Sequence, residues 1–285
     1  MDYANPDALV STEWLAQHLD APDVRVVDAT WFLPSQNRNE HEEYEQAHIP
    51  GAVFFDINDI ADTTLDLPHM MPSPEKFSSK MRKLGLGDGN RIVVYDANGG
   101  YCAAARAWWM FRVFGHEDVA VLDGGLPKWE REDRPIEDGK LTVMEKHFTS
   151  RHDHTLVRDK RQMLANVESR REQVIDARSP GRFDGTDAEP RTSKHVGHIP
   201  GSLNVPVPTL MDKENFFTMR SADELKAVFD KAGVDLNKPI AASCGSGVTA
   251  CVPVFALYLL GHTDAAVYDG SWVEWGNADD VPIER

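Results

Sequence analysis

The sequence predicts an α/β protein built as a tandem duplication, with two domains that each contain a mainly parallel sheet covered by helices on both faces. Two observations carry this prediction. Short runs rich in Val, Ile, Leu and Ala alternate with longer amphipathic segments, a pattern typical of parallel sheets with helical crossovers. In addition, a set of landmarks recurs in the same order in both halves of the chain. Such a repeat indicates two copies of one domain of ordinary size.

The duplicated landmarks are short motifs at nearly the same spacing in each half. They are Val26-Val27-Asp28-Ala29 with Val174-Ile175-Asp176-Ala177, His48-Ile49-Pro50-Gly51 with His198-Ile199-Pro200-Gly201, Gly115-His116 with Gly261-His262, Asp123-Gly124-Gly125 with Asp269-Gly270-Ser271, and Trp129 with Trp275. From them we expect a supporting domain 1 at residues 8–135, an interdomain linker at 136–166, and a catalytic domain 2 at 167–285.

The elements of the first copy follow from its hydrophobic pattern. Apolar runs predict strands, and amphipathic segments predict helices. The strands are expected at 24–28, 91–95 and 119–122, and the helices at 74–83 and 103–114.

Residues 131–167 are rich in charge and lack a periodic core segment, so we expect a connector that crosses the surface. His152 and His154 flank Asp153 within it. No further ligand stands at a suitable spacing, and these residue types are usually solvated. We therefore expect a polar surface segment there and no metal site.

Whole-chain properties limit the possible functions. The 285 residues are 41% hydrophobic and carry a formal charge of −16, which argues against nucleic acid or an anionic membrane as the main partner. Three cysteines are too few for a disulfide framework and suit a reducing compartment. The N-terminal residues resemble no targeting peptide, and no apolar run reaches the length of a membrane span. We expect a cytoplasmic location.

Cys244 is the most informative residue. It follows an apolar run that ends at Ser243 and opens a turn of sequence Cys-Gly-Ser-Gly-Val-Thr-Ala, residues 244–250, before an expected helix at 252–260. Gly245 and Gly247 allow the backbone amides to approach a central atom closely. Such a nest at a helix N-terminus stabilises an anion and favours a reactive thiolate.

The duplication provides an internal control for Cys244. Aligning the shared landmarks places Asp96 at the corresponding position of the first copy, within Tyr95-Asp96-Ala97-Asn98-Gly99-Gly100. Domain 1 therefore keeps the strand and the turn but lacks the thiol. We expect domain 2 to perform the chemistry, in a site between the two halves, because ligand clefts favour domain interfaces.

These motifs resemble the two-domain rhodanese superfamily, and within it the 3-mercaptopyruvate sulfurtransferases. The resemblance rests on the 244–250 loop, the Asp-Gly-Ser-Trp-Val-Glu-Trp run at 269–275 and the paired His-Ile-Pro-Gly segments. It covers residues 11–275. It implies a sulfurtransferase in which Cys244 takes sulfur from 3-mercaptopyruvate as a persulfide, releases pyruvate, and passes the sulfur to an acceptor without a cofactor or metal.

The resemblance also implies the roles of other residues. Arg182 and Arg191, in segments similar to the family's substrate-binding region, are expected to bind the donor carboxylate and carbonyl, for which arginine forks are suited. The amides of Gly245, Ser246, Gly247, Val248 and Thr249 are expected to stabilise the anionic sulfur. Ser246 and His69 correspond to a serine and a histidine proposed to relay a proton in the family, but the expected acidic position falls on Asn58. Asparagine can orient an imidazole but cannot stabilise its charged form.

Three alternatives to this reaction differ in donor or class. Thiosulfate is a less favoured donor. The resemblance implies basic residues directly after the loop cysteine in rhodaneses that prefer thiosulfate, whereas this chain has the neutral Gly245 and Ser246 there. A phosphatase needs an arginine six positions after the cysteine, where this chain has Ala250. A non-catalytic persulfide carrier or binding module would need neither the glycines nor both arginines. The acceptor is left open between cyanide, a small thiol and a thioredoxin-like protein.

The remaining cysteines and the tryptophans are expected to have structural roles. Cys251 is expected to pack in the core within the 252–260 helix region. Cys102, in a loop after Tyr101, is expected to be structural rather than an exposed redox thiol. The tryptophans are expected in core or interdomain packing; they are Trp108, Trp109, Trp272 and Trp275.

Overall fold

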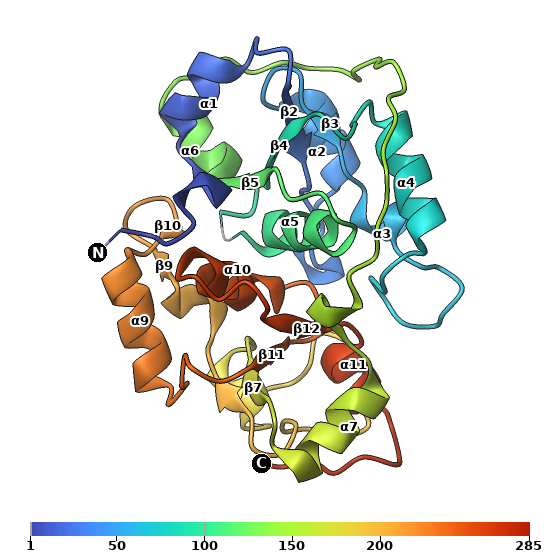
Figure 1. The fold of residues 1–285 in the computed structure, drawn as a ribbon, viewed down its shortest axis with the longest axis vertical. Coiled ribbons are helices and arrows are strands. Elements are labelled where there is room, and N and C mark those ends of the chain that lie inside the picture. Colours follow the sequence, from blue (N-terminus) through green and yellow to red (C-terminus); the bar gives the residue numbers. More distant parts are fainter. Residues whose placement is uncertain (1, 100) are drawn as a thin grey trace.

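The protein consists of two similar α/β units stacked end to end, as seen in a computed structural model (Figure 1). The structure describes residues 2–99 and 101–285, so Met1 and Gly100 lie outside the described residues. The first unit contains a five-stranded sheet of order β1-β5-β4-β2-β3, in which all neighbours are parallel. Its strands are β1 (Leu9–Val10), β2 (Val24–Asp28), β3 (Val53–Phe54), β4 (Arg91–Tyr95) and β5 (Val119–Leu122).

The second unit repeats this topology with the strand order β6-β12-β11-β7-β8, again wholly parallel. Its strands are β6 (Val157–Arg158), β7 (Gln173–Asp176), β8 (Leu203–Asn204), β11 (Ile240–Ser243) and β12 (Ala266–Tyr268), and a separate antiparallel pair is formed by β9 (Met211–Asp212) and β10 (Thr218–Met219). The predicted duplication and fold class are confirmed.

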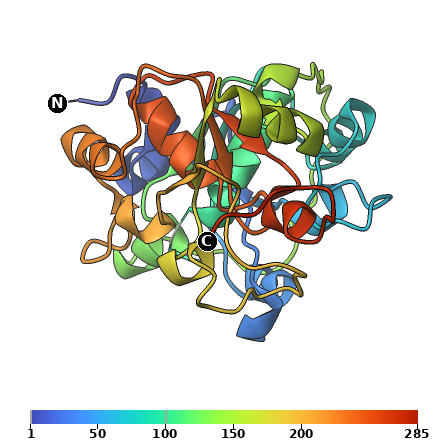
Figure 2. The same ribbon diagram turned by 90° about the horizontal axis from the view of Figure 1, so that it is seen from below.

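Helices pack around both sheets, and Figure 2 shows the molecule from below, with the C-terminus near the centre of the view. In the first unit they are α1 (Thr12–His18), α2 (Glu40–Gln46), α3 (Ile57–Ile60), α4 (Pro74–Lys83), α5 (Cys102–Val113) and α6 (Gly125–Arg131). In the second they are α7 (Lys160–Ser169), α8 (Pro180–Phe183), α9 (Ala222–Lys231), α10 (Cys251–Leu259) and α11 (Ser271–Trp275). No helix in the described part of the chain is long and apolar enough to cross a bilayer.

Most elements expected in the first unit match the structure closely. The three predicted strands correspond to β2, β4 and β5, and the 74–83 segment forms α4. α4 starts at a favourable cap, because the Ser73 hydroxyl accepts the N–H of Lys76 and Pro74 occupies the first turn. The apolar segments expected as helices at 103–114 and 252–260 form α5 and α10, each one residue earlier at both ends.

The expected connector is partly wrong. β6 and the start of α7 lie before residue 167, inside the segment expected as a linker, and β6 pairs with β12 at the edge of the second sheet. These elements escaped the sequence pattern because β6 has two residues and α7 buries only Met163 and Asn166. The domain limits at 135 and 167 themselves stay predictions.

The two units share one hydrophobic core. α5 and α10 lie against each other at the centre of the molecule (Figure 1). The Trp108 ring of α5 lies 4.8 Å from the ring of Phe255 and 5.1 Å from that of Tyr258, both on α10. Trp108 is fully buried, which confirms its expected role in interdomain packing. The contact between these two helices is thus apolar, and it holds the facing loops of the two units in a fixed relation.

Candidate active site

The Cys244 loop joins the buried strand β11 to α10. Its backbone is fastened to the start of α11: the Cys244 N–H donates to Ser271 Oγ at 3.1 Å, and the Cys244 carbonyl accepts the N–H of Trp272 at 2.9 Å. The Gly245 carbonyl accepts the N–H of Val273 at 2.8 Å. The start of the loop is therefore held in place by the first turn of α11.

Gly247 is required by this geometry. Its φ is +79°, and a Cβ at this position would lie 2.6 Å from the Asp269 carbonyl oxygen. No side chain fits that gap without moving backbone. Gly247 thus lets the loop close tightly over Cys244.

The amides of the loop are available to an anion. Among the described groups, no acceptor is hydrogen-bonded to the N–H groups of residues 245–249. Buried or half-buried amides without partners are costly, and an anionic sulfur on Cys244 would satisfy them.

Domain 1 shows what fills the corresponding nest when the thiol is missing. Asp96 follows β4 at the Cys244 position, and its carboxylate accepts the N–H groups of Asn98, Ala103 and Ala104, each at 3.1 Å. A carboxylate of this chain therefore occupies the anion position of the first unit. The expectation that domain 1 lacks the chemistry has a structural reason: its nest is already satisfied.

A cavity of about 270 Å³ lies between the two units beside the Cys244 loop. Domain 1 contributes Trp31, Asn98 and Cys102 to its wall, and domain 2 contributes both predicted arginines and the loop. The lining loop residues are Gly245, Ser246, Val248 and Thr249. Cys244 itself is 1% exposed and lies behind this wall, since the loop residues that follow it line the cavity.

The two arginines differ in their partners. Arg182 Nε and NH2 donate to Glu189 Oε2 at 3.1 and 2.5 Å, so its charge is already compensated. Arg191 forms no ion pair with any described carboxylate. Its NH1 lies 3.5 Å from Ser246 Oγ, and its guanidinium stands 5.8 Å from the centre of the Trp31 ring. Arg191 is therefore the cation best placed to attract an anionic ligand.

His69 reaches the loop from domain 1. Its Nδ1 lies 3.1 Å from Ser246 Oγ, and the residue is 4% exposed with φ +62°. Burial, reinforced by the nearby Arg191 and Arg106 guanidinium groups, lowers the pKa of His69 to about 3. The imidazole is thus neutral at neutral pH, and it is a hydrogen-bond partner of the Ser246 hydroxyl rather than an imidazolium acid.

Asn58 lies apart from this pair. It is exposed on the short helix α3, where its N–H donates to Asp56. No hydrogen bond links the Asn58 side chain to His69 among the described residues. A neutral imidazole carries no charge that a carboxylate at position 58 would have to balance.

Comparison with known proteins decides the family. Residues 11–132 and 159–278 both match the family model described as a rhodanese-like domain. The chain belongs to the rhodanese family. The human 3-mercaptopyruvate sulfurtransferase is 43% identical over 273 residues, covering 94% of this chain and 91% of that protein.

Further relatives agree with this assignment. The thiosulfate/3-mercaptopyruvate sulfurtransferase 1, mitochondrial, of Arabidopsis thaliana is 44% identical and covers 98% of this chain and 78% of its own length. The crystal structure of SseA from Escherichia coli, a 3-mercaptopyruvate sulfotransferase, superimposes with a TM-score of 0.84 at 41% identity, covering 93% and 98% of the two chains.

The sequence patterns did not point to Arg106, which connects the halves of this rhodanese-family site. Arg106 is fully buried on α5 and donates to the carbonyls of Gly247 at 3.1 Å and His69 at 2.6 Å. Its NH2 also donates to Asp269 Oδ1 at 2.8 Å, and Asp269 Oδ2 accepts the N–H of Met71 at 2.7 Å. The available signal was its place as the one charged residue within the apolar run 103–111.

Ser271 was also missed. Its hydroxyl accepts the Cys244 N–H and lies 4.0 Å from Cys244 Sγ, while its backbone has φ +47°. The corresponding residue of the first unit is Gly125, which has φ +55°. The available signal was a serine at a position where the first copy has glycine. A serine adopts a positive φ only at an energetic cost, which a hydrogen bond of its side chain can offset.

The other cysteines have different environments. Cys251 is fully buried and begins α10, as expected for core packing. Cys102 begins α5 rather than lying in a loop, because the turn after β4 ends one residue earlier at Tyr101. It is partly exposed and lines the cavity, and burial of its thiol raises the pKa well above the ordinary value. Cys102 is therefore a protonated thiol at neutral pH.

We predict that the Arg106–Asp269 pair is a major stabilising element. Arg106→Met should lower the free energy of unfolding by about 3–5 kcal/mol, because it leaves a buried carboxylate without its cation. The double variant Arg106→Met/Asp269→Leu should lose less than the sum of the single variants. Urea unfolding measures both. The exposed pair Lys194–Asp279 is the control: Lys194→Met should cost at most about 1 kcal/mol, and equal losses at the two sites would contradict the prediction.

We predict a pH-dependent stability that originates in His69. Its pKa is about 3 in the folded chain and about 6.5 when unfolded. The unfolded state therefore binds the extra proton first, and stability falls as the pH drops from about 6.5 towards 3. Between pH 6.5 and 5 this loss is on the order of 2 kcal/mol. Chemical unfolding at several pH values should show a shallower pH dependence for His69→Gln; identical slopes would refute the assignment.

Proposed function

We propose that the chain is a sulfurtransferase that takes sulfur from 3-mercaptopyruvate through a persulfide on Cys244. The observation that supports this most is the loop of residues 244–250, which surrounds a cysteine with uncommitted amides beside an arginine-lined cavity. An anionic sulfur is the species that such a nest stabilises. The relatives named for this reaction support the same conclusion.

The first half-reaction balances as a nucleophilic displacement at sulfur. The Cys244 thiolate attacks the donor sulfur, an S–S bond forms, and the C–S bond of the donor breaks. The electron pair passes to the carbon fragment, which leaves as the enolate of pyruvate. Protonation of that enolate at carbon yields pyruvate, and Cys244 keeps the transferred sulfur.

The cavity residues divide the remaining tasks. Arg191, with no carboxylate of its own, binds the donor carboxylate, and Arg182 borders the same space while held by Glu189. Ser246 lies between Arg191 and His69, so its hydroxyl can pass a proton from solvent to the enolate carbon, while the neutral imidazole orients that hydroxyl. The loop amides hold the persulfide sulfur in its anionic form.

In the second half-reaction an acceptor attacks the outer sulfur, and the Cys244 thiolate leaves. The family acts with thiol or cyanide acceptors. We propose cyanide, a small thiol or a thioredoxin-like protein as acceptors here, in a cytoplasmic setting supported by a chain with too few cysteines for a disulfide framework. Thiosulfate is the second donor to test, because the Arabidopsis relative carries both donors in its name.

We predict that incubation with 3-mercaptopyruvate adds about 32 Da, one sulfur atom, to Cys244. Mass spectrometry of proteolytic peptides should find the adduct on the peptide of Cys244 and on neither of the other cysteine peptides. Pyruvate should appear in the same amount. A protein that releases no pyruvate and gains no mass on Cys244 would exclude this reaction, and an adduct formed only from thiosulfate would change the donor.

We predict that Arg191→Ala lowers kcat/KM for 3-mercaptopyruvate by about 10- to 100-fold, the value of a charge-assisted hydrogen bond to the donor. Steady-state assays of pyruvate release measure it. Arg161→Ala, on the exposed face of α7, is the matched control and should keep wild-type kinetics. An Arg191→Ala enzyme as active as that control would remove Arg191 from the donor site.

A further inference from the structure

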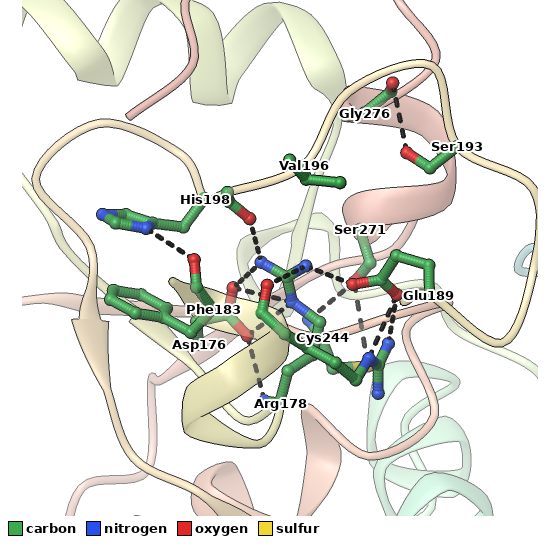
Figure 3. A network of polar contacts seen from close by, with 12 residues as sticks. Asp176, Arg178, Phe183, Glu189, Ser193, Val196, His198, Cys244, Ser271 and Gly276 are labelled. Carbon is green, nitrogen blue, oxygen red and sulfur yellow. Dashed lines mark hydrogen bonds and ion pairs between the residues drawn. The ribbon is translucent and has the colours of Figure 1, made fainter. Parts of the chain in front are cut away.

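The duplication reveals a second site when the two units are compared at the end of their central strands. In domain 2, Asp176 ends β7 and its carboxylate binds the guanidinium of Arg178, at 3.1 Å from Nε and 2.7 Å from NH2 (Figure 3). The same guanidinium donates to the carbonyl of Gly197 at 2.8 Å and to Glu189 at 2.7 Å, and it stands 4.4 Å from the ring centre of Trp272. The cation is held in a complete, buried cradle.

Domain 1 contains the counterpart of this cradle without the arginine. Asp28 ends β2 and pairs with Tyr95, as Asp176 pairs with Ser243. Two residues later the N–H of Thr30 donates to Asp28 Oδ1 at 2.8 Å, as the N–H of Arg178 donates to Asp176 at 3.0 Å. Thr30 therefore stands where the second unit has Arg178.

The other walls of the cradle correspond as well. Ala47 precedes the first His-Ile-Pro-Gly motif as Gly197 precedes the second. Leu126 takes the place of Trp272, because the N–H of each donates to the carbonyl that follows the central strand, that of Asp96 or Cys244. Together with Asp28 and Thr30, both Ala47 and Leu126 line a single cavity of about 340 Å³.

The charge of this cavity suits a cation. Asp28 is 1% exposed and forms no ion pair among the described residues, and Glu43 and Glu130 add two carboxylates at the wall. Burial raises the pKa of Asp28 to about 6, so its carboxylate is ionised at neutral pH. A buried carboxylate without a cation is costly, and a bound cation would repay that cost.

We propose that the domain 1 cavity binds the guanidinium group of a ligand from outside the chain, in the position that Arg178 fills in domain 2. The planar cation would donate to Asp28 and to the Ala47 carbonyl and lie on Leu126, as its counterpart does on Trp272. Thr30 and Tyr95 give Asp28 hydrogen bonds from neutral groups, but neither carries the positive charge that Arg178 brings to Asp176. The Thr30 hydroxyl also accepts the N–H of Ala97 at 2.9 Å.

Among the described residues, Arg38 is the one cation that lines the cavity, and it is engaged elsewhere. Its Nε donates to Glu43 at 2.8 Å, and its guanidinium lies 3.8 Å from the centre of the Phe32 ring. The Arg38 side chain is 40% exposed. The interior around Asp28 is thereby left to an external group.

The test measures the binding of methylguanidinium to the full chain by ligand-observed NMR, and locates the bound compound in crystals soaked in it. Density for the planar cation between Asp28 and the Ala47 carbonyl is expected. Thr30→Arg should abolish binding, because the new side chain fills the cradle, and Asp28→Asn should weaken it about tenfold or more. Thr30→Ser keeps the hydroxyl and the open cavity, so it should bind like the wild type.

Two results would overturn the proposal. One is equal binding by the wild type and Thr30→Arg, with both variants shown to be folded by thermal unfolding. The other is a crystal structure in which Arg38 itself contacts Asp28. A parallel titration with N-acetylargininamide identifies the source of the group: tighter binding than methylguanidinium indicates an arginine side chain of another protein, and weaker binding indicates a small guanidine. Pyruvate release by Cys244 is assayed separately and does not depend on this outcome.

Discussion

The buried ion pair between Arg106 and Asp269 is the interaction on which the geometry of the active site depends. The guanidinium comes from domain 1 and the carboxylate from domain 2, and between them they hold the Gly247 carbonyl, the His69 carbonyl and the N–H of Met71. A buried pair of this kind contributes little net stability compared with an apolar contact, but breaking it is costly. Its effect is to specify one relative placement of the Cys244 loop and His69.

The interface has a second, symmetric link. In domain 1, Asp123 occupies the position of Asp269, and it accepts the N–H of Met219 from domain 2 at 3.0 Å. In each unit, the aspartate that follows the strand next to the sheet edge accepts a backbone N–H of the other unit. The apolar contact of α5 with α10 lies between these two links. Because each unit contributes one such link, the cavity beside Cys244 has fixed segments of both units as its walls.

The two copies diverge where the chemistry lies. Domain 2 leaves the nest amides uncommitted around Cys244, whereas domain 1 fills its nest with the carboxylate of Asp96. At the end of the neighbouring strand the difference is reversed. In domain 2 the Arg178 guanidinium binds Asp176, whereas in domain 1 Asp28 lines a cavity with Thr30 at the position of that arginine. The same framework therefore surrounds a cysteine with an amide nest in one half and surrounds Asp28 with an acidic cavity in the other.

Local patterns were sufficient for the strands β2, β4 and β5 and for α4, because each combines an apolar period with clear end signals. They failed for β6 and the start of α7, whose few buried residues give no periodic signal. The loop cysteine and both arginines were predicted from residue type and motif, but the sequence could not show that Arg182 is paired with Glu189 while Arg191 is not. Such pairing depends on side chains brought together across loops.

By itself, the sequence determined that the chain is duplicated, that Cys244 stands in a glycine-bearing loop after a strand, and that Asp96 replaces it in the sister copy. These are properties of order and spacing along one chain. Only the tertiary structure decided that His69 meets Ser246, that the imidazole is neutral, and that Arg106 joins the two halves. Those facts depend on burial and on distances between residues far apart in sequence, which set the dielectric and the charges around each group.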